Sequence, residues 1–281
     1  MKKNFFLIFL LGLVSFISFV QGQTINTNEQ KNLYRAGESL TYEGKFKKFG
    51  LAFSIAELTF TVSDLPGTQN YLVQSEANSK GTLTKLFNFK FYQLYKSTVD
   101  GNRLQILKTD KRDEQGDRIR NSLADFDYNA QKVVYVETDP NDLTRPPRRV
   151  ASTITENTQD IVSGVYALRG KQFAVGQRFV FKISDSGLVY EVPVQITARE
   201  KKKSILGKKW CWRIEPEIFG DGRIIEQEGS LTIWITDDED RIPVRAELET
   251  KLGDVRIKLK KIQTKDLNLE DDGSDDDDED S

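Results

Sequence analysis

The segment TIWITDDEDRIPVRAEL, residues 232–248, places four consecutive acidic residues between two runs of alternating hydrophobic side chains. The hydrophobic positions are Leu231, Ile233 and Ile235 on one side, and Ile242, Val244, Ala246 and Leu248 on the other. Successive side chains of a β-strand point to opposite faces, so this period of two indicates two strands that each bury one face. The segment therefore predicts a strand, an acidic connection and a second strand.

The acidic connection, Asp237–Asp240, allows three interpretations: a metal site, a catalytic cluster and a hairpin turn. A calcium-binding EF-hand loop needs oxygen ligands at alternate positions and a glycine at the sixth. Counted from Asp238, the fifth position is Ile242 and the sixth is Pro243, so the EF-hand pattern fails. Aspartate favours turns, and Arg241 offsets part of the acidic charge. We therefore expect a hairpin turn and no metal.

The same alternation recurs along most of the chain. Residues 51–62, 178–184 and 255–259 repeat it, and turn-forming pairs such as Pro66-Gly67 and Ser186-Gly187 separate such runs. Many short strands with turn signals between them are typical of a meandering sheet. The sequence predicts an all-β fold, mainly antiparallel, as an open or flattened β-barrel-like sheet with one central α-helix.

The predicted helix is the segment NTQDIVSGVYALRG, residues 157–170, in which apolar side chains follow helical spacing. We expect it to run from about Thr158 to Leu168, with Asn157 or Thr158 as its N-terminal cap. Gly170 suits the position just after the helix end, the C′ position. The helix falls near the middle of the chain, between two strand-rich halves.

Both ends of the chain differ from the strand-rich body. Lys2 and Lys3 precede an apolar run from Phe5 to Val20, which has the pattern of a secretory leader and is too short for a membrane span. The expected division is a signal peptide at 1–22, a flexible segment at 23–32, a single β-rich domain at 33–264 and an acidic disordered tail at 265–281. We expect export to the periplasm or cell surface of a bacterium, with no transmembrane segment after cleavage.

The chain contains no histidine and one cysteine. This composition excludes a Ser-His-Asp or Cys-His catalytic site and a structural zinc site, and we expect no cofactor. Cys211 is expected to be a buried small hydrophobe, with a reactive thiol as the alternative. Basic runs at 45–48, 145–149 and 201–209 lie in separate predicted loops, with residues 199–204 as a hairpin tip, so no nucleic-acid partner is expected.

One strand offers a candidate binding surface. In LFNFKFYQLY, residues 86–95, four aromatic side chains share one face: Phe87, Phe89, Phe91 and Tyr95. A concave apolar sheet surface can hold an apolar small molecule, although aromatic residues at this spacing also form ordinary cores. The favoured interpretation is a non-enzymatic envelope protein that binds an apolar ligand or an envelope protein on its curved sheet.

The alternative is a carboxylate-based hydrolase acting on envelope glycans. Such an enzyme needs two carboxylates at a suitable separation. Asp160, Tyr166 and Arg169 on the predicted helix are the polar residues that could contribute. Asp160 and Arg169 fall on opposite sides of a helix, which favours a structural role.

Several short motifs resemble, in order, the exported bacterial family known as domain of unknown function 3108. They are Gly37-Glu38-Ser39-Leu40-x-Tyr42, the helical set Asp160, Ser163, Tyr166 and Arg169, Leu206-Gly207, the set Trp234, Asp237, Asp238, Arg241 and Pro243, and Gly253. The resemblance extends over roughly residues 33–262. It implies a periplasmic or surface β-rich protein in which these residues form a structural motif, and it implies no particular reaction.

Overall fold

The computed structural model describes residues 33–48, 50–81, 85, 90–251 and 253–271. The described residues form a sixteen-stranded sheet and one α-helix of nine residues. In chain order the elements are β1 (Ser39–Lys48), β2 (Leu51–Asp64), β3 (Tyr71–Ser79), β4 (Phe91–Val99), β5 (Ile106–Gln115), β6 (Arg118–Asp127), β7 (Lys132–Thr138), β8 (Arg148–Thr153), β9 (Thr158–Asp160), α2 (Ile161–Arg169), β10 (Arg178–Asp185), β11 (Leu188–Ser204), β12 (Gly207–Pro216), β13 (Gly229–Thr236), β14 (Pro243–Thr250), β15 (Gly253–Gln263) and β16 (Asn268–Glu270).

The sheet consists of two meanders that meet at β1 and β15. Its order is β8-β7-β6-β5-β4-β3-β2-β1-β15-β14-β13-β12-β11-β10-β9, with β16 pairing β15. β1 and β15 are antiparallel, with Leu40 opposite Ile262, whereas β9 and β10 are parallel. The two ends of the described chain therefore meet at the centre of the sheet, and the two edges of the sheet come from the middle of the chain.

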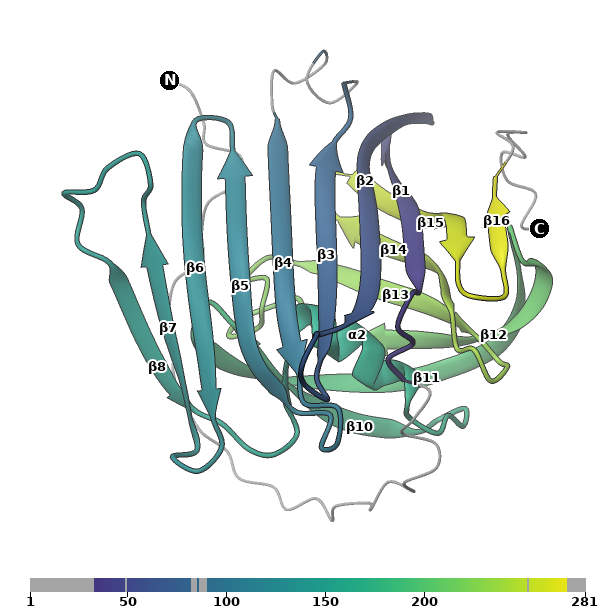
Figure 1. Ribbon diagram of the computed structural model, residues 1–281. Helices are drawn as coiled ribbons and strands as arrows, with labels where there is room; N and C mark the ends of the chain where they lie inside the picture. The colour runs from purple at the N-terminus through teal and green to yellow at the C-terminus, as the bar shows by residue number, and fades with distance from the viewer. Residues whose placement is uncertain (1–32, 49, 82–84, 86–89, 252, 272–281) are drawn as a thin grey trace.

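The sheet folds over so that its edges approach each other around α2. Figure 1 shows β2–β8 as one curved wall and β10–β13 running across it at a steep angle, with α2 between them. The Ser152 hydroxyl of β8 donates a hydrogen bond to the carbonyl of Gly187, 2.7 Å away in the β10–β11 turn. Among the described residues no strand pairing joins β8 to β9 or β10, so the sheet is not closed. The expected open antiparallel sheet with a central helix is confirmed.

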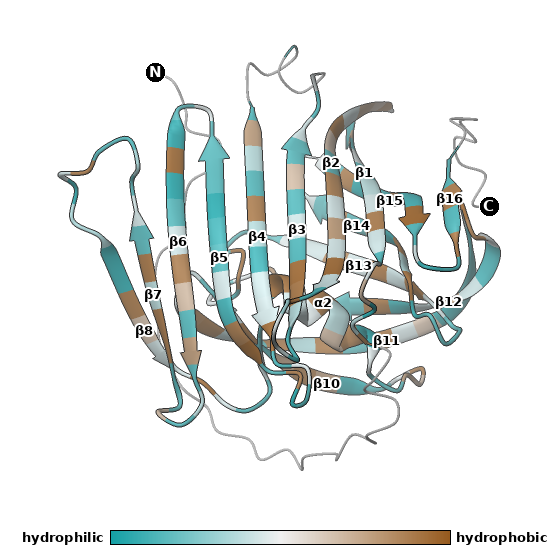
Figure 2. Ribbon diagram, viewed as in Figure 1, coloured by the Kyte–Doolittle hydropathy of each residue, from teal (hydrophilic) through white to brown (hydrophobic). Residues whose placement is uncertain are grey.

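Hydrophobic side chains fill the interior in three clusters. The first joins β2–β7 to α2 through residues such as Val73, Ile106 and Tyr166; the second joins β1 to β12–β15 through Leu40, Cys211 and Leu259; the third includes Ile183, Ile196 and Ile235. In Figure 2 the hydrophobic bands of β3 and β5 lie at the ends of these strands nearest α2. This burial supplies most of the stabilisation of the fold.

The predicted helix forms, but it begins later than expected. The residues Asn157 and Thr158 do not cap it: Thr158–Asp160 is the strand β9, which pairs with Lys182–Ser184 of β10. Asp160 is the cap, because its carboxylate accepts the Ser163 amide at 2.7 Å while the Ser163 hydroxyl accepts the Asp160 amide at 3.0 Å. This reciprocal pair is a capping box.

The end of α2 lies close to the expected boundary but differs in its cap. The helix ends at Arg169, and Gly170 is the C-cap residue instead of the expected C′ residue, with φ −82°, which is not left-handed. A Cβ at Gly170 would lie 2.6 Å from Cδ1 of Leu33, so close packing requires the glycine. Within the described residues, no helix has the length and apolar character needed to cross a membrane.

Two other segments differ from simple expectation. Residues 199–204 are not a hairpin tip, because β11 continues to Ser204 and the turn lies at Ile205-Leu206, before Gly207 with φ +80°. β16 pairs with β15 and lies within the segment 265–281, for which a tail is expected. The expected signal peptide at 1–22, the flexible segment at 23–32 and residues 272–281 lie outside the described residues.

Cys211 is fully buried on β12, as expected, between the exposed Trp210 and the half-buried Trp212. Burial raises the pKa of its thiol to about 11. Because the thiolate is the reactive form, burial and the raised pKa both oppose modification.

We predict that Cys211 of the folded protein reacts with an aromatic disulfide reagent at least about 100-fold more slowly than in urea-unfolded protein at about pH 8. With a pKa of about 11, only about one thousandth of the thiol is ionised at that pH. The measurement is the absorbance of the released thiolate over time. Equal rates for the folded and unfolded protein would contradict the prediction.

Candidate functional site

A buried ion pair connects three distant parts of the chain. The Arg169 guanidinium on α2 donates to both carboxylate oxygens of Glu38, with Nη1–Oε1 at 2.6 Å and Nη2–Oε2 at 2.9 Å. The side chains of Arg169 and Glu38 are 2% and 0% exposed. Arg169 Nη2 also donates to the carbonyl of Asp240, 2.9 Å away, in the acidic turn. The segment before β1, the helix and the acidic turn are therefore tied together at one guanidinium.

Aromatic side chains surround this ion pair. The ring of Tyr34 stacks on Tyr166 and on Tyr71, with centroid distances of 5.4 and 5.6 Å, and the Tyr42 hydroxyl donates to the Pro243 carbonyl at 2.8 Å. Burial lowers the pKa of Arg169, but the hydrogen bonds and charge of Glu38 outweigh burial and raise the pKa above its ordinary value. The guanidinium therefore stays charged and fully paired.

The four acids of the opening segment form the turn between β13 and β14. Asp237 accepts hydrogen bonds from Trp212 Nε1 at 2.7 Å and from Arg199 Nε at 2.6 Å. Asp238 accepts from Thr236 Oγ1 at 2.6 Å and pairs with Lys209 Nζ at 2.7 Å. The predicted hairpin turn is confirmed, and protein donors already use these two carboxylates.

The other residues of the motif that runs from Trp234 to Pro243 shape the same turn. Arg241 has φ +49°, stacks on Phe173 with its Cζ 4.8 Å from the ring centroid, and donates to the Lys171 carbonyl at 3.3 Å. Trp234 is buried on β13, and its Nε1 donates to Glu200 at 2.5 Å. The motif residues are thus brought together as structural supports.

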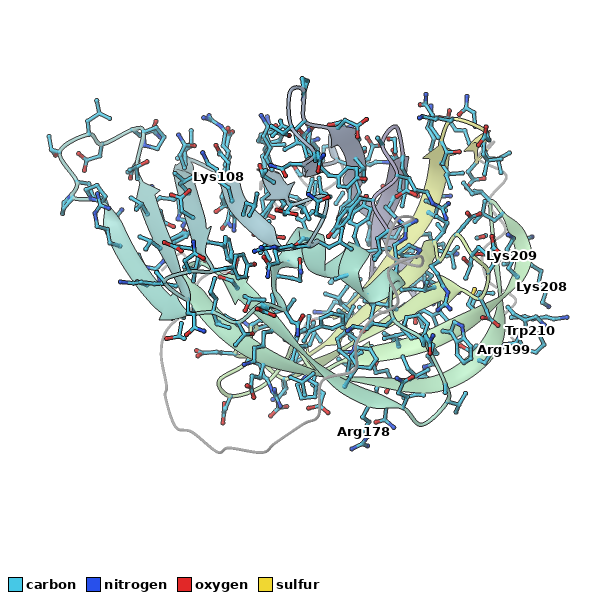
Figure 3. All side chains as sticks on the ribbon, turned by 60° about the horizontal axis from the view of Figure 1, so that its bottom comes forward. Lys108, Arg178, Arg199, Lys208, Lys209 and Trp210 are labelled. Carbon is cyan, nitrogen blue, oxygen red and sulfur yellow. The ribbon has the colours of Figure 1, made fainter. Side chains whose placement is uncertain are left out.

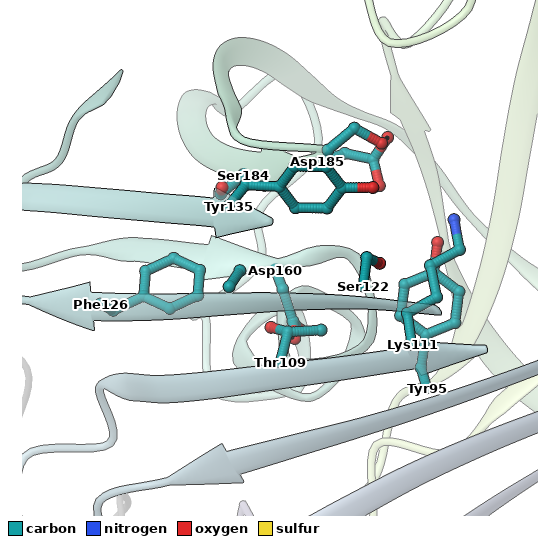
Figure 4. A pocket seen from close by; sticks show the side chains of 11 residues that line it. Tyr95, Thr109, Lys111, Ser122, Phe126, Tyr135, Asp160, Ser184 and Asp185 are labelled. Atoms are coloured by element: carbon teal, nitrogen blue, oxygen red, sulfur yellow. Dashed lines mark hydrogen bonds between the residues drawn. The ribbon is translucent and has the colours of Figure 1, made fainter. Parts of the chain in front are cut away.

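A small polar cavity lies between the sheet wall and the β10–β11 turn (Figure 4). Its volume is about 20 Å³, which is room for about one water molecule or one hydroxyl group. The lining residues are Tyr95, Thr109, Lys111, Ser122, Ala124, Phe126, Tyr135, Asp160, Ser184, Asp185 and Ser186. Most of them carry polar groups, so the cavity is a candidate binding site for a polar group.

Asp160 forms the floor of this cavity. Besides capping α2 through the Ser163 amide, its carboxylate accepts hydrogen bonds from the hydroxyls of Ser97 at 2.5 Å and Thr109 at 2.6 Å. It is 2% exposed. Three donors therefore fix this carboxylate, which positions the helix against β4 and β5.

Lys111 and Asp185 have fewer partners than Asp160. Nζ of Lys111 lies 4.6 Å from the centroid of the Tyr95 ring and hydrogen-bonds to the Tyr95 side chain, and no ion pair joins it to a carboxylate of the described residues. Burial lowers the pKa of Lys111, but Tyr95 and the Asp185 carboxylate outweigh burial and raise the pKa above its ordinary value. Asp185 accepts a hydrogen bond from the Ser186 hydroxyl at 3.1 Å. The cavity therefore holds an ammonium and a carboxylate that do not pair directly.

The same face of the wall stays polar beyond the cavity. Asp113, two residues after Lys111 on β5, accepts from Gln93 at 2.7 Å and from Arg118 at 2.6 Å. On the neighbouring strand β6, Arg120 pairs with Asp139 at 2.6 Å. We call Gln93, Tyr95, Lys111, Asp113, Arg118, Arg120, Ser122 and Tyr135 the polar wall.

The predicted aromatic surface is only partly described. β4 begins at Phe91, so Phe91 is at the end of the strand, and Phe87 and Phe89 lie outside the described residues. Tyr95 lines the cavity. Lys111 and Asp185 were missed, because nothing in their local sequence distinguishes them from solvated strand and turn residues.

We predict that Glu38→Gln lowers the free energy of unfolding by about 3–5 kcal/mol, because it leaves the Arg169 charge buried without its counter-charge. The double variant Glu38→Leu with Arg169→Met removes both charges together and should recover part of that loss. Urea unfolding followed by circular dichroism measures both. Glu228→Gln is the control, since Glu228 pairs with Lys251 at 2.7 Å where both side chains are over 70% exposed. Equal losses for Glu38→Gln and the control would contradict the prediction.

We also predict a contribution of Asp238 to stability that depends on pH. Burial raises its pKa, but hydrogen bonds from Lys209 and Thr236 outweigh burial and hold the pKa below the ordinary 3.8. The stabilisation is therefore present above about pH 4 and is lost as the pH falls through the folded-state pKa. Asp238→Asn should lower the unfolding free energy at neutral pH by about 1 kcal/mol and reduce its change between pH 7 and pH 3. The exposed Glu239, changed to Gln, is the control and should alter neither value.

Comparison with solved structures identifies similar folds. A β-barrel-like protein of the domain of unknown function DUF1849 from Brucella abortus is 12% identical and matches 83% of this chain and 100% of its own, with a TM-score of 0.57. A protein with a YmcC-like fold from Bacteroides fragilis is 9% identical and matches 82% of this chain and 96% of its own, with a TM-score of 0.35. The Brucella abortus protein shares the fold of this chain.

Comparison with curated proteins finds no match. The family described as a protein of unknown function, DUF3108, matches residues 40–260, a range that contains the helical motif and the acidic turn. Because this match covers most of the chain, the protein belongs to the DUF3108 family.

Proposed function

We propose that this protein is a non-enzymatic binding protein that holds a neutral carbohydrate against the polar wall. The observation that carries this proposal is the pair of charged groups in the cavity, Lys111 and Asp185. Both line the same cavity and interact electrostatically, but they form no direct ion pair. A buried charged group is costly unless it has a hydrogen-bonding partner. A ligand that satisfies both groups at once would therefore gain affinity.

The chemistry of the cavity selects among ligand classes. An anionic group would face the Asp185 carboxylate, a cationic group would face Lys111, and an apolar group would form no hydrogen bond with either. A hydroxyl group accepts from an ammonium and donates to a carboxylate through one oxygen atom. The cavity has room for about one such group, whereas an amide needs two separate atoms for the same roles. Tyr95 and Tyr135 also line the cavity, with Lys111 over the ring of Tyr95 and Arg148 over the ring of Tyr135.

This proposal changes the ligand expected from the aromatic surface. Of the aromatic set Phe87, Phe89, Phe91 and Tyr95, Tyr95 lies on the polar wall, where the neighbouring Gln93 and Asp113 are hydrogen-bonded to each other. A protein partner remains compatible with the polar wall if it presents a hydroxyl side chain. We favour a carbohydrate because it presents many hydroxyls along the length of the wall.

The carboxylates of the cavity argue for binding and against hydrolysis. Asp160 and Asp185 line the same cavity, which is the arrangement that a carboxylate-based glycan hydrolase needs. Asp160, however, accepts three hydrogen bonds and caps α2, so a structural role explains its place in the cavity.

We further propose that the protein acts outside the cytoplasm, as the expected leader at 1–22 supports. The β-rich domain would then carry the binding site, and the acidic run that follows β16 in the sequence would be a solubilising end. The proposed location is the periplasm or the cell surface.

We predict that soluble neutral oligosaccharides bind and that Lys111→Met and Asp185→Asn each weaken binding at least about tenfold, since a hydrogen bond to a charged group contributes about 1.5–3 kcal/mol. Calorimetry with hexasaccharides of glucose and of N-acetylglucosamine is the measurement. The control is Lys108→Met, because Lys108 lies on the same strand with an exposed side chain.

Three results would contradict the proposed function. The first is the absence of any oligosaccharide binding, and the second is equal loss in the Lys108 control. The third is release of shortened sugars, lost in Asp185→Asn, which would favour the hydrolase. Thermal unfolding of each variant separates a damaged fold from a damaged site.

A further inference from the structure

The β11–β12 hairpin presents a basic and aromatic face. Register pairs Lys203 with Lys208, Lys201 with Trp210 and Arg199 with Trp212, so these side chains lie on one face of the two strands. We call Arg199, Lys201, Lys203, Lys208, Trp210 and Trp212 the basic hairpin face. Figure 3 shows Arg199, Lys208 and Trp210 together at one extremity of the molecule, with Lys108 on the opposite side and Arg178 at the bottom of the view.

Trp210 is the centre of this face. Its side chain is 44% exposed, with Arg199 Cζ 4.6 Å and Lys201 Nζ 5.2 Å from the ring centroid. Cation–π contacts hold both positive charges beside the indole, which stays accessible. Asp237 lies against this face, where its carboxylate accepts hydrogen bonds from Arg199 and Trp212. The surface is therefore strongly positive around one exposed indole.

The opposite face of the hairpin anchors it to the body. Lys209 pairs with Asp238 at 2.7 Å, Cys211 is fully buried, and Nζ of Lys202 lies 4.8 Å from the Trp234 ring centroid. β10 pairs with β11 only as far as Gln195, and β13 pairs with β12 only from Cys211 onward. The outer part of the hairpin is thus a two-stranded ribbon with one face fixed and the basic face outward.

We propose that the basic hairpin face docks on an anionic phospholipid surface. Each lysine or arginine near such a surface contributes favourably, and an exposed tryptophan prefers the interface between headgroups and acyl chains. A soluble polyanion would need the cations alone, whereas this face combines them with an accessible indole at an extremity. This surface is separate from the polar wall, so it extends the proposed function to attachment at a membrane.

Tryptophan fluorescence tests this docking directly. The chain has three tryptophans, of which Trp234 is 5% exposed and Trp212 is half-buried, so Trp210 should dominate any change. We expect a blue shift and quenching by brominated acyl chains with vesicles of phosphatidylcholine that contain about one third phosphatidylglycerol. Vesicles of phosphatidylcholine alone should give neither. About 1 M salt should reverse the binding, since it shortens the Debye length to about 3 Å.

Charge reversal supplies the decisive comparison. The double variant Lys201→Glu with Lys208→Glu should bind the anionic vesicles about 30-fold more weakly or worse. Lys108→Glu with Arg178→Glu makes the same change in net charge at exposed sites elsewhere and should bind almost as well as the unchanged protein. Trp210→Phe should remove the fluorescence shift while cosedimentation with vesicles is only weakened.

Several outcomes would overturn the proposal. Equal loss in both double variants would mean that net charge alone attracts the protein. Binding of soluble alginate, a carboxylated polysaccharide, without binding of vesicles would assign the face to a polyanion. Vesicle binding in which the Trp210 signal does not change would place the contact elsewhere. Each assay uses the folded chain, and circular dichroism confirms the fold of every variant.

Discussion

The fold depends on one constraint: the charge of Arg169 must be satisfied in the interior. A buried ion pair often adds little net stability compared with a well-packed apolar pair, because both charges lose their hydration. It does impose geometry, since a guanidinium binds a carboxylate through two fixed hydrogen bonds. Here Glu38 occupies one side of the guanidinium and the Asp240 carbonyl another. Arrangements that separate these three segments leave a bare charge in the core.

The position of α2 follows from this constraint and in turn fixes the candidate site. Arg169 holds the C-terminal end of the helix, and Asp160 holds its N-terminal end through hydroxyls on β4 and β5. The cavity lies at the Asp160 end, against the turn that carries Asp185. The ion pair and the cavity thus lie at opposite ends of the same nine-residue helix.

The alternation of apolar and polar residues predicted the strands well, because every half-buried strand shows this alternation whichever strands it pairs with. The helix boundary could not be predicted in this way, since Asn157, Thr158 and Asp160 are all suitable caps. Pairing of Thr158–Asp160 with β10 decides among them, and that contact is not local. The cavity was hidden for the same reason. Lys111, on β5, and Asp185, at the end of β10, are 74 residues apart in sequence and become neighbours only when the sheet folds over.

The two proposed surfaces differ in their electrostatic setting, and this difference separates their functions. Lys111 is half-buried beside Tyr95, where salt screens charges less than at the surface. Lys201 and Lys208 are exposed to solvent, where salt screens them strongly. A rise in ionic strength should therefore release the basic hairpin face from an anionic surface while leaving the polar wall almost unaffected. One chain would thus carry a ligand site insensitive to salt and an attachment face that responds to it, because its cations occupy two different dielectric environments.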